Sequence, residues 1–310
     1  ATNSGTSALE VALSAISILP GDEVILPAYT LISTAHAVLR SGGVPVFADI
    51  DDTFTISPSS IRSHITKRTK AIIPVHVFGN VADMASIARI ATKHKLFVIE
   101  DCCQAVGAEY GGKKVGTLGD FGCYSFSAGK AIFAGEGGMV VTSNRLMNER
   151  MQHMKHELDD LHAGVGTIRT SVSLPRMTEM QASLARSILA QLDDLNNNRR
   201  KNFHYFNTVI DHSLPFHVYN ITPHANPSFS RLVFMIDFRR LALSRDQFLK
   251  RMHSQNIPFK IFYPYPLYSF PLFQRQYDSI LNSNFPFSYN NHVHYKALHL
   301  PFVEKFCKQQ

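Results

Sequence analysis

The chain has no apolar run long enough to cross a bilayer. Its longest apolar stretches, such as Ala71 to Val77, hold only a few residues, whereas a membrane-spanning helix needs about 20. No signal-peptide pattern stands at the first residues. We therefore expect no membrane partner and a cytoplasmic location.

Cysteine is scarce, with 4 in 310 residues, and no two cysteines have the spacing of metal ligands. The 15 histidines are scattered, without a pair at i and i+4 beside a glutamate. We therefore expect neither a disulfide framework nor a metal site, and cysteine usage fits a reducing compartment.

Basic residues form no long run, although the net charge is +7. The densest group, Arg199 to Lys201, ends a predicted long helix, where positive charge complements the helix dipole. No nucleic-acid-binding module accompanies it, so we expect no nucleic-acid partner. The positive balance suits an anionic small molecule.

Strand-like and helix-like runs alternate between residues 24 and about 141. The strand candidates are Val44 to Ala48, Ala71 to Val75, Phe97 to Ile99, Gly122 to Phe126 and Gly138 to Thr142. One helix candidate, Ala82 to His94, carries an apolar stripe. This alternation predicts an α/β fold with a mainly parallel sheet covered by helices on both faces.

The pattern changes after about residue 200, where Phe, Tyr, Pro and Asn become frequent. A helix from about Thr178 to Arg200, with apolar residues at helical spacing, is expected to pack between two domains. We predict a large domain over 1–177, a linking helix over 178–200 and a smaller α+β domain over 201–310.

Lys130 stands between a strand-like aromatic run and the glycine turn Gly135 to Gly138. A buried lysine that loses its proton can bond to a carbonyl carbon, and Ser125 five residues earlier offers a hydroxyl to an anion. The alternative is a solvated lysine in a turn.

Asp101 ends the apolar run that precedes Cys102 and Gln104, so its carboxylate is expected at the end of a buried strand. Open α/β sheets place function there, and such a carboxylate can pair with a protonated pyridine nitrogen. A helix N-cap is the other interpretation.

The segment Asn3 to Leu9 is a Gly/Ser/Thr turn that opens a helix. The amides at such a helix start attract phosphate, although Ser and Thr there also cap helices, and both roles can coexist.

These motifs, in this order, resemble the DegT/DnrJ/EryC1/StrS aminotransferases, which are pyridoxal phosphate (PLP)-dependent sugar aminotransferases of fold type I, and in particular the perosamine synthetases. The resemblance covers Asn3 to Leu9, Gly21 to Ile25, Pro45 to Asp51, Thr69 to His76, Asp101 to Gln104, Gly119 to Gly138 and Arg176 to Glu179. It implies a seven-stranded type of sheet and a homodimer with shared active sites.

The resemblance also implies roles for single residues. Lys130 would bond to the cofactor and act as acid and base, Asp101 would pair with the ring nitrogen, and Gln104 would lie near the ring. The phosphate would be bound by a set from two segments, namely Gly5, Thr6, Ser7 and Ser125. The implied reaction moves an amino group, typically from glutamate, to a keto sugar on a nucleotide, with the turn Gly135 to Gly138 favouring carbon C4.

Three positions depart from the family pattern. Leu31 replaces an aromatic residue that stacks on the cofactor ring, Leu174 replaces an asparagine that reaches the partner's phosphate, and Tyr268 replaces a histidine near the substrate. Similar proteins also carry several dozen residues before the Asn3 motif, so the resemblance implies a truncated chain or an incomplete substrate entrance.

Two other functions stay open. The departures at Leu31 and Leu174 are compatible with a catalytically degraded PLP-fold protein that binds or regulates. A PLP-dependent sugar dehydratase is the second alternative, but such relatives carry histidine at the position of Lys130.

Overall fold

A six-stranded sheet forms the centre of the computed structural model, which describes residues 1–155, 175–211 and 213–309. The strand order is β2-β1-β3-β4-β7-β8, and all neighbours are parallel except β8, which is antiparallel to β7. The strands are β1 (Glu23–Pro27), β2 (Val44–Ala48), β3 (Thr69–Ile72), β4 (Phe97–Asp101), β7 (Phe121–Ser125) and β8 (Gly138–Val141). The mainly parallel sheet expected from the sequence is confirmed.

The seventh strand expected from the resemblance is not formed by the described residues. Thr2 pairs with Gly138 on the outer side of β8 through two backbone hydrogen bonds of 2.8 Å. The chain then turns into helix α1 at Gly5, so this contact stays a single bridge.

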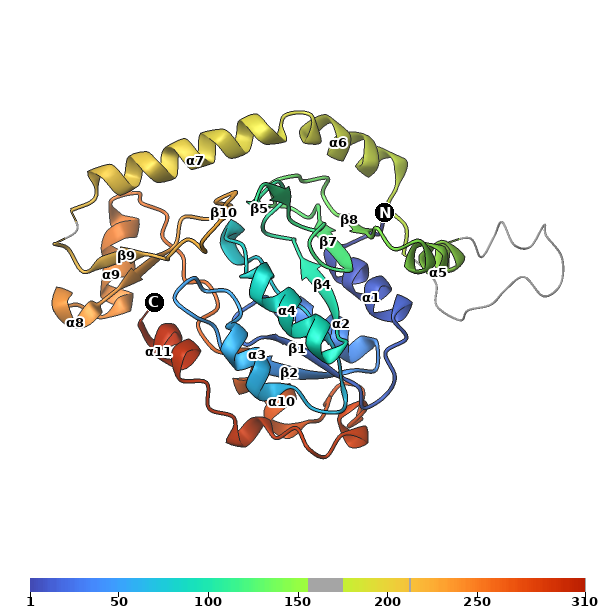
Figure 1. Cartoon of the computed structure of the whole chain (residues 1–310). Helices are drawn as coiled ribbons and strands as arrows, with labels where there is room; N and C mark the ends of the chain where they lie inside the picture. The colour runs from blue at the N-terminus through green and yellow to red at the C-terminus, as the bar shows by residue number, and fades with distance from the viewer. Residues whose placement is uncertain (156–174, 212, 310) are drawn as a thin grey trace, which may run out of the picture.

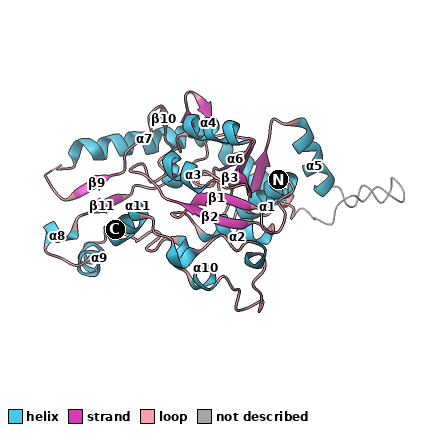
Figure 2. Cartoon of the chain, turned by 60° about the horizontal axis from the view of Figure 1, so that its bottom comes forward, coloured by secondary structure: helices cyan, strands magenta, loops and turns pink. Residues whose placement is uncertain are grey.

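Helices cover both faces of the sheet (Figures 1 and 2). They are α1 (Gly5–Ala15), α2 (Ile32–Arg40), α3 (Pro58–His64), α4 (Met84–His94) and α5 (Arg145–Lys155). The predicted helix over Ala82 to His94 is confirmed as α4, which Asp83 caps by accepting the amide of Ser86. The apolar stripe of α4 is buried, and the helix packs against β4.

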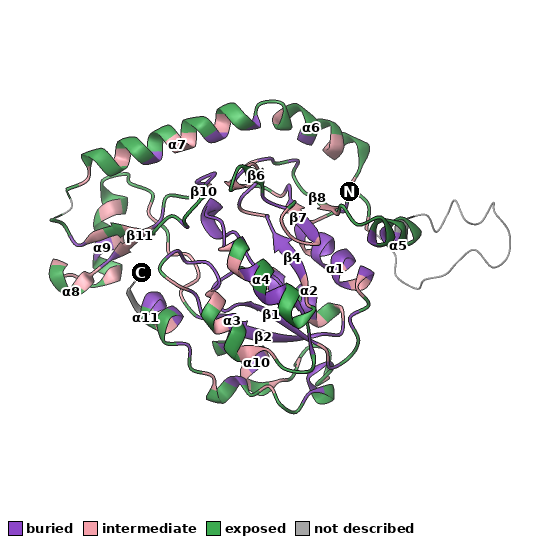
Figure 3. Cartoon of the chain, viewed as in Figure 1, coloured by how far each residue is buried: buried purple, intermediate pink, exposed green. Residues whose placement is uncertain are grey.

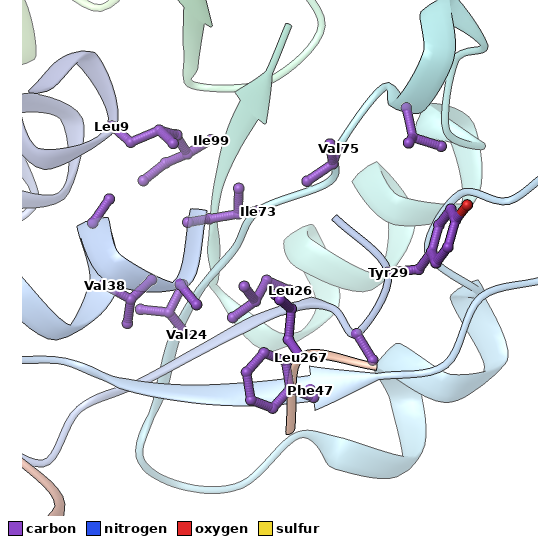
Figure 4. Close-up of a cluster of buried hydrophobic side chains, with 14 of the residues drawn as sticks. Leu9, Val24, Leu26, Tyr29, Val38, Phe47, Ile73, Val75, Ile99 and Leu267 are labelled. Atoms are coloured by element: carbon purple, nitrogen blue, oxygen red, sulfur yellow. The ribbon is translucent and has the colours of Figure 1, made fainter. Parts of the chain in front are cut away.

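The two faces of the sheet bury two separate hydrophobic clusters. Val24 and Leu26 of β1 belong to the cluster under α1 and α2, whereas Ile25 belongs to the cluster under α3 and α4. This alternation follows from the period of two in a strand, and burial on both faces is typical of parallel sheets. Figure 4 shows part of the first cluster, where Leu26 and Phe47 lie beside Leu267 from the C-terminal part of the chain.

The remaining elements are shorter and lie outside the central sheet. Two small sheets are built from β5 (Glu109–Tyr110), β6 (Lys113–Lys114) and β10 (Ala225–Asn226), and from β9 (Phe216–Val218) and β11 (Phe234–Ile236). The helices are α6 (Glu179–Leu189), α7 (Leu192–Val209), α8 (Phe238–Leu241), α9 (Arg245–Ser254), α10 (Pro271–Arg275) and α11 (Pro301–Gln309). Short 3-10 turns are η1 (Val77–Gly79), η3 (Leu267–Ser269), η4 (Phe287–Tyr289) and η5 (Tyr295–Ala297).

The segment predicted as one linking helix forms two helices, α6 and α7, which are separated at Ala190 and Gln191. In the first of these helices, Met180 is 83% exposed and Leu184 is 44% exposed. Figure 3 shows α6 and α7 as largely exposed. The predicted division into domains stays a prediction.

The end of the chain packs on the central sheet instead of standing apart. Phe306 of α11 contacts Tyr29 and Phe54, with ring centroids 5.2 and 4.0 Å away. Asp49, just after β2, accepts the amides of Phe302 and Val303 at 2.9 and 2.8 Å. Asp49 therefore acts as a helix cap supplied from a distant part of the sequence.

A buried network fixes the end of β4. Glu100, fully buried, accepts hydrogen bonds from His76 Nε2 at 3.0 Å and from the amide of Gly116 at 2.8 Å through one oxygen. The other oxygen accepts the amides of Leu118 and Gly119, both at 2.7 Å. A single carboxylate thus joins β4, the segment after β3 and the loop before β7.

His76, Glu100 and Cys102 also place three metal-ligating atoms within 4.8 Å of one another. Both oxygens of Glu100 are already engaged, and His76 Nδ1 accepts the amide of Ala82 at 3.2 Å. The cluster is therefore a satisfied hydrogen-bond network.

In the described part of the chain, no helix is long and apolar enough to span a membrane.

Replacing Asp49 by alanine should lower the free energy of unfolding by about 2 kcal/mol, because the first turn of α11 loses its acceptor. Urea unfolding of the variant Asp49→Ala measures this. The variant Asp194→Ala, at an exposed position of α7, should stay within about 0.5 kcal/mol of the unmodified chain. Equal losses in both variants would contradict the capping role.

The variant Glu100→Gln should have a free energy of unfolding about 3–5 kcal/mol lower than that of the unmodified chain. The reason is that an amide nitrogen would face hydrogen-bond donors that now meet a carboxylate. Glu149→Gln is the matched control, since that side chain is 50% exposed in an ion pair with Arg145 and should cost under about 1 kcal/mol.

This difference should depend on pH. Burial raises the pKa of Glu100, but the hydrogen bonds from His76 and the loop amides outweigh it and leave the pKa below 4.5. A lowered pKa gives stability that is present above pH 4.5 and is lost as the pH falls through the folded-state pKa. The difference in free energy of unfolding between the unmodified chain and Glu100→Gln should therefore decrease on acidification. A difference that increases would contradict this assignment.

Candidate active site

Asp101 lies at the carboxyl end of β4, where the sheet edge is expected to carry function. Its side chain is buried, with Oδ2 accepting the hydroxyl of Thr34 at 2.9 Å and Oδ1 accepting the amide of Cys103 at 3.1 Å. Thr34 belongs to α2, so this helix and the chain after β4 together fix the direction of the carboxylate.

Gln104, three residues later, joins two further segments. Its Oε1 accepts the amide of Phe78 at 3.0 Å, and its Nε2 donates to the hydroxyl of Tyr263 at 3.1 Å. Phe78 has a left-handed backbone with φ of 55°, which turns its amide toward Gln104. Burial raises the pKa of Tyr263 to about 12, so this phenol stays protonated at neutral pH.

Lys130 is half-buried and lines a small cavity of about 50 Å³. The walls come from five separate segments of the chain: Phe78, Cys103 to Gln104, Gly129 to Ala131, Ser230 to Arg231, and Phe262 to Tyr263. Lys130 itself sits in a turn, since its amide donates to Ser127 O at 3.2 Å. The structure therefore brings Lys130 and Gln104 together, with Asp101 next to Cys103.

The start of α1 reaches the same region. A Cβ at Gly5 would lie 2.7 Å from Ser125 Cβ and 2.8 Å from Cys103 Sγ, so only glycine allows this approach. Ser4 caps the helix by accepting the amide of Ser7 at 3.1 Å. The capping interpretation of this turn is thus confirmed, and Gly5 stands directly against Ser125.

The other described residues that were expected at the site do not line the cavity of Lys130. Thr6 is half-buried in the first turn of α1, whereas the hydroxyl of Ser7 donates to Asn3 Oδ1 at 2.7 Å. Leu31 precedes α2, is 45% exposed and does not line the cavity of Lys130. Tyr268 lies away from this cavity and donates to Glu304 at 2.5 Å. Leu174 lies outside the described residues.

Several residues of the site were not predicted from the sequence. Thr34 holds Asp101, and Tyr263, Ser230 and Arg231 line the cavity beside Lys130. They come from separate parts of the chain, and no local motif marks Thr34, Ser230 or Arg231. For Tyr263 a signal existed, because it stands in the same aromatic and proline-rich segment as Tyr268.

Comparison with known proteins places this geometry in a family. The model of the DegT/DnrJ/EryC1/StrS aminotransferase family matches residues 1–310. A UDP-N-acetyl-3-dehydro-alpha-D-glucosamine 3-aminotransferase of Acidithiobacillus ferrooxidans is 36% identical over 99% of this chain and 79% of its own length. A GDP-perosamine synthase of Escherichia coli O157:H7 is 40% identical over 64% of this chain and 55% of its own length.

One similar protein has another kind of name. A pleiotropic regulatory protein of Geobacillus stearothermophilus is 36% identical over 87% of this chain and 71% of its own length. This chain is thus similar both to named aminotransferases and to a protein named for regulation.

Solved structures agree in fold. DesV of S. venezuelae, described in complex with a ketimine intermediate, superposes with a TM-score of 0.85 at 28% identity, covering 99% of this chain and 76% of DesV. NtdA of Bacillus subtilis, with bound cofactor PMP, superposes with a TM-score of 0.76 at 26% identity, covering 99% of this chain and 66% of NtdA. The dehydratase ColD superposes with a TM-score of 0.75 at 25% identity, covering 83% of this chain and 72% of ColD. The chain therefore belongs to the DegT/DnrJ/EryC1/StrS family of PLP-dependent aminotransferases and has fold type I.

Proposed function

We propose that this chain binds PLP and moves an amino group from an amino acid, with glutamate as the leading donor, to C4 of a nucleotide-linked keto-deoxy sugar. The single observation that carries the proposal is that Lys130 and Gln104 line one cavity whose wall includes Cys103, the residue that donates its amide to the buried Asp101. The family assignment supplies the reaction class.

The residues present fit PLP. The close approach of Gly5 to Ser125 places the first amides of α1 beside a hydroxyl, which is a setting that binds a phosphate group. Thr6 and Ser7 would complete this phosphate site. Asp101 would bind the ring nitrogen, because its buried carboxylate is held by uncharged donors only.

The remaining contacts would come from Gln104 beside the ring and from Leu31 as an apolar neighbour. When bound, PLP supplies an electron sink that makes the proton on Cα of the donor acidic. The amine of Lys130 would take that proton and later deliver one to the sugar carbon, acting as a general base and then as a general acid.

We infer that a homodimer completes the site. Within one chain, the cavity at Lys130 encloses only about 50 Å³, whereas ligand pockets commonly measure about 300–1,000 Å³. The cavity of one chain is therefore smaller than a complete substrate site, and the homodimer itself is what the likeness to fold type I enzymes implies. A cytoplasmic location fits such an enzyme, and the net charge of +7 favours an anionic nucleotide sugar.

A regulatory protein without catalysis is the second candidate. It is supported by the exposed Leu31, which gives no stacking ring, and by the likeness to a protein named for regulation. The dehydratase alternative is supported only by the likeness to ColD, and Lys130 argues against it.

Replacing Lys130 tests the proposal directly. We expect PLP to give a visible absorption band with the unmodified chain, and glutamate to shift that band. In Lys130→Ala the band should be lost and the glutamate reaction should slow by at least about 100-fold, because the proton carrier is removed. Lys113→Ala, an exposed lysine on β6, should behave like the unmodified chain. A band that does not need Lys130 would favour the regulatory candidate.

The choice of carbon needs its own test. The chain should be given nucleotide-linked 4-keto-6-deoxy and 3-keto sugars with glutamate, and the aminated carbon read by NMR. The proposal expects amination at C4. Amination at C3 only would contradict the choice of C4 and would match the reaction for which the Acidithiobacillus relative is named. A deoxygenated sugar without nitrogen would identify a dehydratase.

A further inference from the structure

We propose that Arg231 binds the α-carboxylate of the amino donor, and that the hydroxyl of Ser230 assists it. This inference rests on the proposed aminotransferase function and adds a specificity residue to it. Arg231 lines the same cavity as Lys130, on a segment that follows β10 and that the sequence did not single out.

Arg231 is an exposed residue at the wall of the cavity, and its guanidinium contacts two neighbouring segments. A Cβ at Gly129, next to Lys130, would be 3.7 Å from Arg231 Nη2, and Arg231 Cζ is 5.2 Å from the ring centroid of Phe262. Stacking on an aromatic ring holds a guanidinium plane while leaving its N–H edges available. The charged end of Arg231 therefore lies close to the backbone that carries Lys130, and both residues line one cavity.

Arg231 makes no ion pair or hydrogen bond with the described residues, although arginines elsewhere in the chain do, such as Arg239 with Asp237. The cavity walls contain no carboxylate and carry two positive side chains, Lys130 and Arg231. An anionic ligand group is the chemistry that this wall would accept.

Ser230 gives a second, independent observation. Its hydroxyl oxygen is buried, has no hydrogen-bond partner among the described residues, and its side chain lines the same cavity. A buried hydroxyl without a partner is costly, so a ligand atom that pairs with it would be stabilised. The backbone of Ser230 packs closely on Gly79, since a Cβ added at Gly79 would lie only 2.8 Å from the amide nitrogen of Ser230.

Two substrate groups could supply the negative charge, the donor carboxylate and the diphosphate of the nucleotide sugar. The carboxylate is bonded to the same carbon as the reacting amine, so it must lie close to Lys130. The diphosphate is separated from the reacting sugar carbon by ring atoms and the glycosidic oxygen. Because Arg231 and Lys130 share one small cavity, the carboxylate fits better.

The test compares two donors that differ in one group. 4-Aminobutanoate keeps the side-chain carboxylate of glutamate and lacks the α-carboxylate. In Arg231→Gln, the glutamate concentration that gives half the maximal spectral change should rise about 10- to 100-fold, because a charged, two-pronged hydrogen bond is lost. The concentration for 4-aminobutanoate should be unchanged, so the preference between the two donors collapses. Arg231→Lys should fall between, since lysine keeps the charge without the fork.

Binding is measured in parallel by ligand-observed NMR with glutamate and, separately, with UDP, GDP and dTDP. Arg231→Gln should lose the glutamate signal and keep nucleotide binding, and the control Arg239→Gln, an exposed arginine on α8, should keep both. Loss of nucleotide binding with normal glutamate binding would overturn the inference in favour of the diphosphate.

The two proposals can fail separately. If the unmodified chain gives the Lys130-dependent band and Arg231→Gln binds glutamate normally, the assignment of Arg231 is wrong while the function stands. If the band is absent, the aminotransferase proposal fails, and the NMR comparison with glutamate still decides the role of Arg231.

Discussion

The rest of the site depends on the buried carboxylate of Glu100. Successive residues of a strand point to opposite faces, so fixing Glu100 by four hydrogen bonds also fixes the direction of Asp101 on the other face. There, Thr34 of α2 and the amide of Cys103 meet the Asp101 carboxylate. The strand end is thus held from both faces, which is what a precise site requires.

The central sheet was largely predictable, because its strands are short apolar runs between helical patterns. The prediction of Val44 to Ala48 matches β2, and Ala82 to His94 became α4 with its start moved by two residues. The break at Ala190 was not predictable from apolar spacing, which continues through it. The return of α11 to the sheet was also hidden, since a cap such as Asp49 lies about 250 residues from the helix it serves.

The site divides in the same way. Lys130, Asp101 and Gly5 stand in local patterns, a turn after a strand, a strand end and a helix start, and local patterns can be read from sequence. Tyr263 and Arg231 act through long-range proximity, which requires the fold. The role of Leu31 stays a prediction, since it is 45% exposed and is not among the residues that line the cavity of Lys130.

The charges of the site explain how its parts can orient one ligand assembly. Asp101 is held by an uncharged hydroxyl and an amide, so among the described residues no side-chain cation neutralises it. Arg231, which lines the cavity of Lys130, makes no ion pair with the described residues. In the proposed function, a cationic ring nitrogen would be favoured at Asp101 and a carboxylate at Arg231. Under that proposal, the two opposite charges would orient the donor before any proton moves.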